Sequence, residues 1–239
     1  MLKDHRPYLI KKGFLNLSRF YARRFLHPQF DALGKGCVFL GPWHVEIFGG
    51  PVELGNYAFV VATSDNKVRL SVWPRQKDEG AIRLGDYCLI CPGVRISSAL
   101  EILVGDSCMV ASNAYITDSD WHDIYNRIAP GKAAPVKIEN NVWIGDSAII
   151  CKGVTIGENS IVGAGAVVVH SIPANSIAAG NPARVVKTLD PNQAFTTRAQ
   201  WYADPAKLFE EFDQWDRALL QGNTVRGWLR SIFLPEKGD

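Results

Sequence analysis

The chain has 239 residues, of which 47% are apolar and 21% are charged, and its net charge is +2. This nearly neutral composition is typical of a soluble globular protein and excludes a general nucleic-acid binder. No apolar run reaches the length of about eighteen residues that a membrane span needs, and the N-terminus lacks the apolar core and cleavage site of a signal peptide. We therefore expect a cytoplasmic protein whose five cysteines are free thiols.

Residues 1–35 predict a basic, partly helical lead. Apolar side chains recur in it at helical spacing, with arginines among them: Phe14, Leu17, Phe20, Tyr21 and Phe25. One interpretation is a helix that caps the first coil of the repeat described next, because the open end of a repeat array must be covered. The alternative is a helix that lies on an anionic membrane surface.

Residues 36–187 carry a repeat of six residues, which fits neither a helix nor an alternating strand. In its clearest stretch an aliphatic residue leads each unit: Ile138, Ile144, Ile150, Ile156, Val162 and Val168. A small residue follows each of the first five leaders four places later: Val142, Ala148, Val154, Ser160 and Ala166. Such a period is typical of a solenoid in which each unit forms one short flat side and one corner.

The repeat extends upstream with one change of frame. Before a two-residue slip the leaders are Leu84, Ile90 and Ile96, and after it they are Val104, Val110 and Ile116. Cys88, Val94, Cys108 and Ala114 fill the small position, and a weaker match further upstream places Leu54, Ala58, Val60 and Ser64 in the pattern. Because Cys88 occupies an inward position, we interpret Cys88 and Cys91 as a small core residue and its neighbour rather than a metal or redox CxxC pair.

Two polar stretches, residues 71–81 and 117–137, interrupt the repeat. A solenoid needs no such excursion for packing, and long loops in compact domains are often functional. The longer one carries His122 beside Trp121 and three carboxylates: Asp118, Asp120 and Asp123. An imidazole accepts a proton near neutral pH, and a partner on its other nitrogen fixes the tautomer. Of the three carboxylates we favour Asp120 as that partner.

Residues 188–239 lose the six-residue period and predict a helical tail. Pro205 is expected to begin a helix with Asp204 as its N-cap, ending near Gly222. This helix carries an apolar stripe formed by Leu208, Phe209, Phe212, Trp215 and Leu219. Residues Val225–Phe233 predict a second short helix. We expect the tail to pack on the solenoid or on a neighbouring subunit.

Residues 104–187 resemble the hexapeptide-repeat acyltransferases, in particular the branch with sugar and polysaccharide O-acetyltransferases. The resemblance lies in VGDSCMVASNAYITDSDWH and in PVKIENNVWIGDSAIICKGVTIGENSIVGAGAVVVHSIPANSIAAGNPARVVK. It implies an all-β fold, a left-handed parallel β-helix with helical ends. It also implies a homotrimer with acetyl-CoA bound between subunits, and no metal.

By this resemblance His122 is the general base that activates the acceptor for direct attack on the thioester, without an acyl-enzyme. The late coils would hold CoA through Trp143, Asp146, Gly163 and Ala164, and its phosphates would meet Arg184 and Lys187. His170 stands where related enzymes have a Thr-Lys pair near CoA. Cys91, Asn113, Asp118 and Trp121 are the candidate acceptor-binding residues.

The chain departs from the sugar acetyltransferases at one acceptor contact. Cys91-Pro92-Gly93 stands where those enzymes carry a sugar-binding asparagine, so a small galactoside or maltose is not the expected acceptor. We expect transfer to a hydroxyl of a polysaccharide or lipid-linked glycan precursor, with an amino-sugar nitrogen as the alternative.

Three other functions are weighed against this one. A zinc carbonic anhydrase uses a similar solenoid but needs three converging histidines, and no two of the five histidines here lie within one coil. A nucleotidyltransferase needs a nucleotide-binding domain ahead of the solenoid, which the lead is too short to supply. A non-catalytic trimeric scaffold is the alternative from another class.

Overall fold

The computed structural model describes residues 3–76, 79–190 and 192–236. These residues form two compact units. The larger unit comprises residues 21–200, and the smaller one combines residues 3–20 with residues 201–236.

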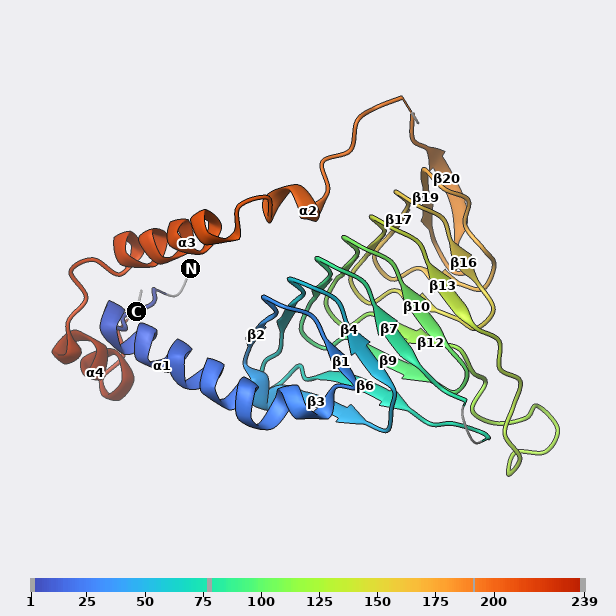
Figure 1. Ribbon diagram of the computed structural model, residues 1–239, viewed down its shortest axis with the longest axis horizontal. Helices are drawn as coiled ribbons and strands as arrows, with labels where there is room; N and C mark the ends of the chain where they lie inside the picture. The colour runs from blue at the N-terminus through green and yellow to red at the C-terminus, as the bar shows by residue number, and fades with distance from the viewer. Residues whose placement is uncertain (1–2, 77–78, 191, 237–239) are drawn as a thin grey trace. The chain divides into compact units, whose positions relative to one another are not determined.

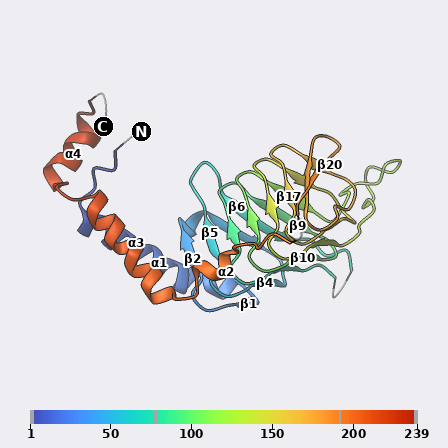
Figure 2. The same cartoon turned by 90° about the horizontal axis from the view of Figure 1, so that it is seen from above.

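The larger unit is a stack of triangular coils whose sides form three sheets (Figures 1 and 2). The first sheet contains β1 (Ala32–Leu33), β4 (Val52–Leu54), β7 (Ile82–Leu84), β10 (Ile102–Val104), β13 (Val136–Ile138) and β16 (Thr155–Ile156). The second contains β2 (Val38–Leu40), β5 (Phe59–Val61), β8 (Leu89–Ile90), β11 (Met109–Val110), β14 (Trp143–Ile144), β17 (Ile161–Val162), β19 (Ser176–Ala179) and β20 (Arg184–Thr188). The third contains β3 (Val45–Phe48), β6 (Val68–Val72), β9 (Arg95–Ser98), β12 (Tyr115–Thr117), β15 (Ile149–Ile150) and β18 (Val167–Val168).

Within the described residues, neighbouring strands pair in parallel except β19 and β20, which are antiparallel. The fold is therefore a solenoid, as the six-residue period predicts, and it is the left-handed parallel β-helix that the family resemblance implies. The aliphatic leaders from Ile138 to Val168 are at most 1% exposed, and the small residues between them at most 2%. Burial of each aliphatic side chain contributes about 1.5–3 kcal/mol, so these inward rows hold the coils together.

Asparagine and aspartate side chains organise the corner between the first and second sheets. The backbone N–H of Asn56 donates to Asp86 (2.7 Å), that of Asp86 to Asp106 (2.8 Å), and that of Asp106 to Asn140 (2.9 Å). The next residue of each turn has a left-handed backbone, for example Asn141 with φ of 55°. Asparagine tolerates this conformation better than most residues, which explains its frequency at the corners.

The two-residue slip in the repeat corresponds to longer strands at the corner between the third and first sheets. Ser98 ends β9 and Ile102 begins β10, and both are fully buried, so the extra residues widen the core. The upstream assignment of Ser64 to an inward position was wrong. Ser64 is exposed in a polar turn before β6, and Ala62 and Val68 fill the core on either side of that turn.

The start of the larger unit covers the first coil. A π-helical turn (Ala22–Leu26) and a 3-10 turn (His27–Gln29) place Ala22, Leu26 and Phe30 in the same core cluster as Phe39. A second 3-10 turn spans Pro42–His44. These contacts support the capping interpretation for residues 22–30.

The smaller unit is helical. It contains most of α1 (Tyr8–Tyr21), α3 (Pro205–Leu219) and α4 (Val225–Phe233), and α2 (Arg198–Trp201) lies at the junction of the two units. The Asp204 carboxylate accepts from the backbone N–H of Lys207, which confirms it as the N-cap of α3. Tyr8 donates to Asp213 at 2.7 Å, so α1 and α3 are joined within this unit. None of the helices in the described part of the chain has both the length and the hydropathy needed to cross a membrane.

Candidate functional site

The segment between β12 and β13 leaves the β-helix at the corner between the third and first sheets, which we call the third–first corner. It forms a loop with an outgoing and a returning limb, the yellow-green excursion beside β12 and β13 in Figure 1. We call residues 118–135 the His122 loop. Its limbs are joined by an antiparallel bridge between Ser119 and Ala133. The backbone N–H of Asp120 donates to Lys132 (2.8 Å) and that of Ala134 to Asp118 (2.9 Å). The loop is therefore a short ordered hairpin.

Asp118 anchors the beginning of this loop in the core. Its fully buried carboxylate accepts from the Ser98 hydroxyl and from the backbone N–H groups of Ala99, Leu100 and Glu101, all at 2.7–2.8 Å. Four donors satisfy a buried charge that would otherwise be very costly. We therefore correct the prediction that Asp118 binds the acceptor, because its oxygens are enclosed and already bonded.

His122 is exposed near the tip of the loop, and its Nδ1 lies 2.9 Å from the carbonyl oxygen of Arg127. A carbonyl can only accept, so Nδ1 carries the proton in the neutral ring and Nε2 carries the lone pair. The predicted orienting role of Asp120 is thus taken by a backbone carbonyl. Asp120 instead forms an ion pair with Lys152 at 2.6 Å.

The third carboxylate of the loop, Asp123, caps the turn that follows His122. It accepts from the backbone N–H groups of Tyr125 and Asn126, both at 2.9 Å. The N–H of Asn126, followed by that of Tyr125, lowers the pKa of the Asp123 carboxyl. An ionised Asp123 therefore stabilises the turn that brings Arg127 back to the imidazole.

Trp121 directs the loop toward the outer face of the third sheet. Its indole Nε1 donates to the Tyr115 hydroxyl at 3.2 Å, and the Arg95 guanidinium lies 4.6 Å from the centre of the Tyr115 ring. The candidate base therefore stands beside a mixed aromatic and polar surface rather than in an enclosed cavity.

The predicted CoA residues gather elsewhere, on the second sheet and at the corner between the second and third sheets. Asp146, Gly163 and Ala164 lie in that corner on successive coils, after β14 and β17. Trp143 lies on the second sheet with 46% of its surface exposed, in cross-strand register with Met109 and Ile161. This arrangement offers a shallow strip of backbone beside an apolar row.

Cys91 and Asn113 lie on the same second–third corner in earlier coils. Asn113 is exposed with φ of 60°, and its backbone N–H donates to Pro92 at 3.0 Å. Cys91 is partly buried, and burial raises the pKa of its thiol, so it is neutral near pH 7. Both predicted acceptor residues therefore stand closer in the fold to the candidate CoA strip than to the His122 loop.

Arg184 and Lys187 lie on the exposed strand β20, at the C-terminal end of the second sheet. Lys187 is paired with Ile177, so it continues the cross-strand row that contains Trp143 and Ile161. Arg184 is paired with Ala179, whose Cβ is the atom that a side chain added at Gly163 would meet first. His170 is separate from this group, because it follows β18 at the third–first corner.

Within one chain, the His122 loop and the CoA candidates other than His170 therefore lie at opposite ends of the strands of the third sheet. The strands of this sheet are two to five residues long. At about 3.3 Å per residue such strands separate the two groups by roughly 7–17 Å along the strand direction.

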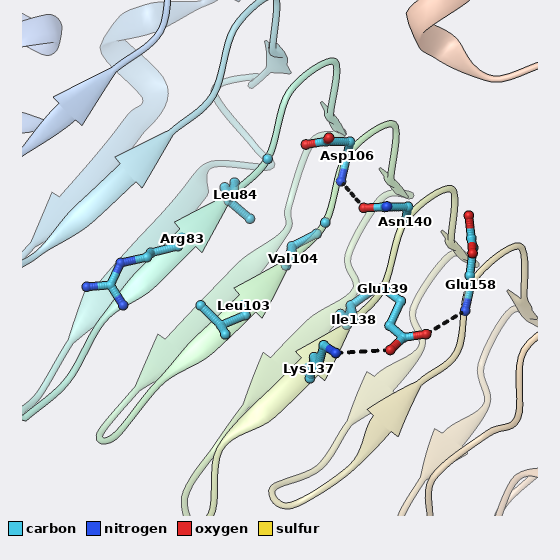
Figure 3. Close-up of a pocket in the computed structure, with 12 residues that line it drawn as sticks. Arg83, Leu84, Leu103, Val104, Asp106, Lys137, Ile138, Glu139, Asn140 and Glu158 are labelled. Carbon is cyan, nitrogen blue, oxygen red and sulfur yellow. Dashed lines mark hydrogen bonds and ion pairs between the residues drawn. The ribbon is translucent and has the colours of Figure 1, made fainter.

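A groove of about 490 Å³ on the first sheet contains none of these residues (Figure 3). Both of its basic side chains already have partners: Lys137 pairs with Glu139 at 3.0 Å, and Arg83 pairs with Glu53 and Glu101. We therefore do not assign the candidate site to this groove. Within the described residues, no three His, Cys, Asp or Glu side chains are grouped so that they could hold a metal ion.

The sequence analysis did not predict two residues that lie outside the His122 loop and contact it. Lys152 pairs with Asp120, and Arg75 contacts both limbs. Arg75 lies in the other excursion, residues 71–81, of which residues 77 and 78 are outside the described part. That excursion was a visible signal, but its spacing from His122 gave no hint of contact.

The comparisons with known proteins agree with the repeat. The family model described as "Bacterial transferase hexapeptide (six repeats)" matches residues 135–170. A probable acetyltransferase of Mycobacterium tuberculosis is 35% identical over 173 residues, covering 69% of this chain and 54% of that protein. The galactoside O-acetyltransferase of Escherichia coli is 38% identical over 91 residues, covering 37% of this chain and 45% of that protein. The chain thus spans about half the length of these curated relatives.

A solved structure supplies a further comparison. It is a mutant of AntD, an N-acyltransferase from Bacillus cereus, in complex with dTDP-4-amino-4,6-dideoxyglucose and coenzyme A. The likeness has a TM-score of 0.57 at 19% identity and covers 80% of this chain and 95% of that chain. At this identity the likeness demonstrates a common fold.

Proposed function

Because the chain belongs to the hexapeptide-repeat acyltransferase family, we propose that it transfers an acetyl group from acetyl-CoA to a hydroxyl of a sugar or polysaccharide precursor. The two curated relatives described above are named as acetyltransferases, and one of them acts on a galactoside hydroxyl. These names support the donor and the sugar class of the acceptor.

The observation that carries the proposal is the state of His122. Its Nδ1–H is occupied by the Arg127 carbonyl, so Nε2 presents a lone pair from an ordered and exposed loop. In the proposed reaction Nε2 removes the proton of the acceptor hydroxyl as the oxygen attacks the thioester carbonyl. The carbon–sulfur bond then breaks, CoA leaves as a thiolate, and the imidazolium returns the proton to the sulfur.

The donor would bind along the second–third corner. Backbone groups near Asp146, Gly163 and Ala164 would pair with the pantetheine arm, and Trp143 would contact its apolar parts. Arg184 and Lys187 lie on an exposed strand at the end of this strip, where cations can meet the phosphates. No position for His170 at the CoA strip follows from the fold, so its predicted cofactor role requires the neighbouring copy.

We further propose that the active unit is a homotrimer, because one chain keeps the base and the donor strip apart. The outward row of the second sheet is apolar and is the surface we expect the partner to cover: Phe59, Leu89, Met109, Trp143, Ile161 and Ile177. Light scattering at micromolar concentration should give three times the monomer mass of 26.4 kDa. A monomeric mass would contradict the proposed shared site.

An acceptor screen tests the function directly. Acetyl-CoA is mixed with a panel of free sugars, nucleotide-linked sugars, amino sugars and polysaccharides, and release of free thiol is followed. Alkaline hydroxylamine then separates the outcomes, because it cleaves an O-acetyl ester and leaves an N-acetyl amide intact. The His122→Ala variant supplies the blank. A chain that neither binds CoA by calorimetry nor releases thiol with any acceptor would favour the scaffold.

A further inference from the structure

Two excursions of the β-helix leave the same third–first corner. One follows β6, with residues 73–76 and 79–81 described, and the other is the His122 loop after β12. Only β9 separates them, because β6 pairs with β9 and β9 pairs with β12. The turn between β9 and β10 is short, residues 99–101.

Arg75 makes this connection. Its Nη2 donates to the Ser119 hydroxyl at 3.2 Å and to the Gly131 carbonyl. Ser119 belongs to the outgoing limb of the His122 loop, and Gly131 belongs to the returning limb. The guanidinium therefore ties the two limbs together at their base. Lys152 contacts the outgoing limb through Asp120.

Gly131 connects the Arg75 contact to the backbone segment that carries His122. A Cβ at this position would collide with the backbone carbonyl oxygens of Asp120 and His122. The returning limb thus lies directly against the backbone of His122. A displacement of Gly131 toward this segment would therefore press on the backbone of His122.

We propose that Arg75 is a positioning residue for His122. It holds the His122 loop in the position that the proposed reaction requires. This inference rests on the proposed function for its catalytic consequence, but not for the loop contact itself. Arg75 is exposed, and the inward rows of the coils do not involve it. Loss of the Arg75 side chain should therefore loosen the His122 loop while the β-helix stays folded. A reacting group misplaced by 1 Å can cost about 10²-fold in rate.

The test compares Arg75→Gln and Arg75→Lys with Arg69→Gln in the full chain. Arg69 is the matched control, because it lies on the preceding strand β6 and forms an exposed ion pair with Glu46 at 2.8 Å. Hydrogen exchange is measured at the amides that join the limbs, those of Asp120, Asp123 and Ala134. In Arg75→Gln we expect exchange faster by about tenfold or more, with an unchanged thermal midpoint. Arg75→Lys should be intermediate, because an ammonium keeps the charge and can donate to the same oxygens, but from a shorter side chain without the fixed planar geometry of the guanidinium.

Turnover with the acceptor found in the screen provides the second measurement. Arg75→Gln should lower kcat by about 10–100-fold and leave the KM for acetyl-CoA within about twofold. If hydrogen exchange in Arg75→Gln equals that of the wild type, the inference is overturned. Lost turnover without faster exchange would also overturn it, because Arg75 would then act by contacting the substrate. If His122→Ala keeps full turnover, the proposed base is wrong, and the exchange data still decide whether Arg75 holds the loop.

Discussion

The coils and the His122 loop are stabilised by different interactions. The coils depend on inward aliphatic rows such as Ile144, Ile150 and Ile156, all fully buried. The loop depends on polar contacts: four donors to Asp118, the Lys152–Asp120 ion pair and the guanidinium of Arg75. The stability of the coils and the proposed chemistry of the loop therefore depend on separate parts of the chain. Changes in each part should affect one property and spare the other.

The largest expected effect is on turnover, from His122→Ala. A positioned base contributes about 10²–10⁴-fold, and turnover measured by thiol release should fall by that factor. The free energy of unfolding and the CoA affinity should match the wild type, because His122 is exposed and outside the inward rows. Turnover close to the wild type would place the base elsewhere, and His170, on the same corner, would be examined next.

The opposite effect is expected from Ile144→Ala. Ile144 is fully buried between Val110 and Val162 of the neighbouring coils, so its truncation should cost about 2–5 kcal/mol in urea unfolding. The folded fraction should keep its turnover. Ile149→Ala is the matched control, because Ile149 faces outward and is 37% exposed. Equal losses of stability in the two variants would contradict the assignment of inward and outward rows.

The fold was predictable from the sequence because the core imposes its period on the chain. Each coil repeats the same inward positions, so Ile138 and Ala148 could be assigned from spacing alone. The assignment of Ser64 failed because a polar turn broke the frame where no strong repeat flanked it. The N-cap of α3 was also predictable, since Asp204 and Pro205 signal a helix start by local chemistry.

The candidate site was predictable in its location but not in its contacts. The excursion marked His122, because a long polar loop has no packing role in a solenoid. The partners of the carboxylates could not be assigned, because they depend on the loop conformation. Asp118 bonds to the turn of the preceding coil, and Asp120 bonds to Lys152 on the following one. Neither spacing carries a signal in a single sequence.

A smaller effect is expected on donor binding. Replacing Arg184 and Lys187 together with alanine should weaken CoA binding by about 1–3 kcal/mol, the range for hydrogen bonds to charged groups. Calorimetry measures this change, with Lys137→Ala as the control. Lys137 is an exposed lysine on the first sheet that pairs with Glu139. Unchanged CoA affinity in the double variant would remove β20 from the donor site and leave the coil surface without an assigned function.

The smallest effect is a pH-dependent loosening of the loop alone. Hydrogen bonds from Asn126 and Tyr125 lower the pKa of Asp123, so its ionised form stabilises the turn. This stabilisation is complete above the ordinary aspartate pKa of about 3.9 and is lost as the pH falls through the lower folded-state pKa. Protection of the Tyr125 and Asn126 amides against hydrogen exchange should therefore decrease below about pH 4. The Gly145 amide, bonded to Val162 at 2.8 Å within the coils, should keep its protection. In Asp123→Asn the pH dependence of the turn should disappear, and a dependence that persists in this variant would assign the titration to another group.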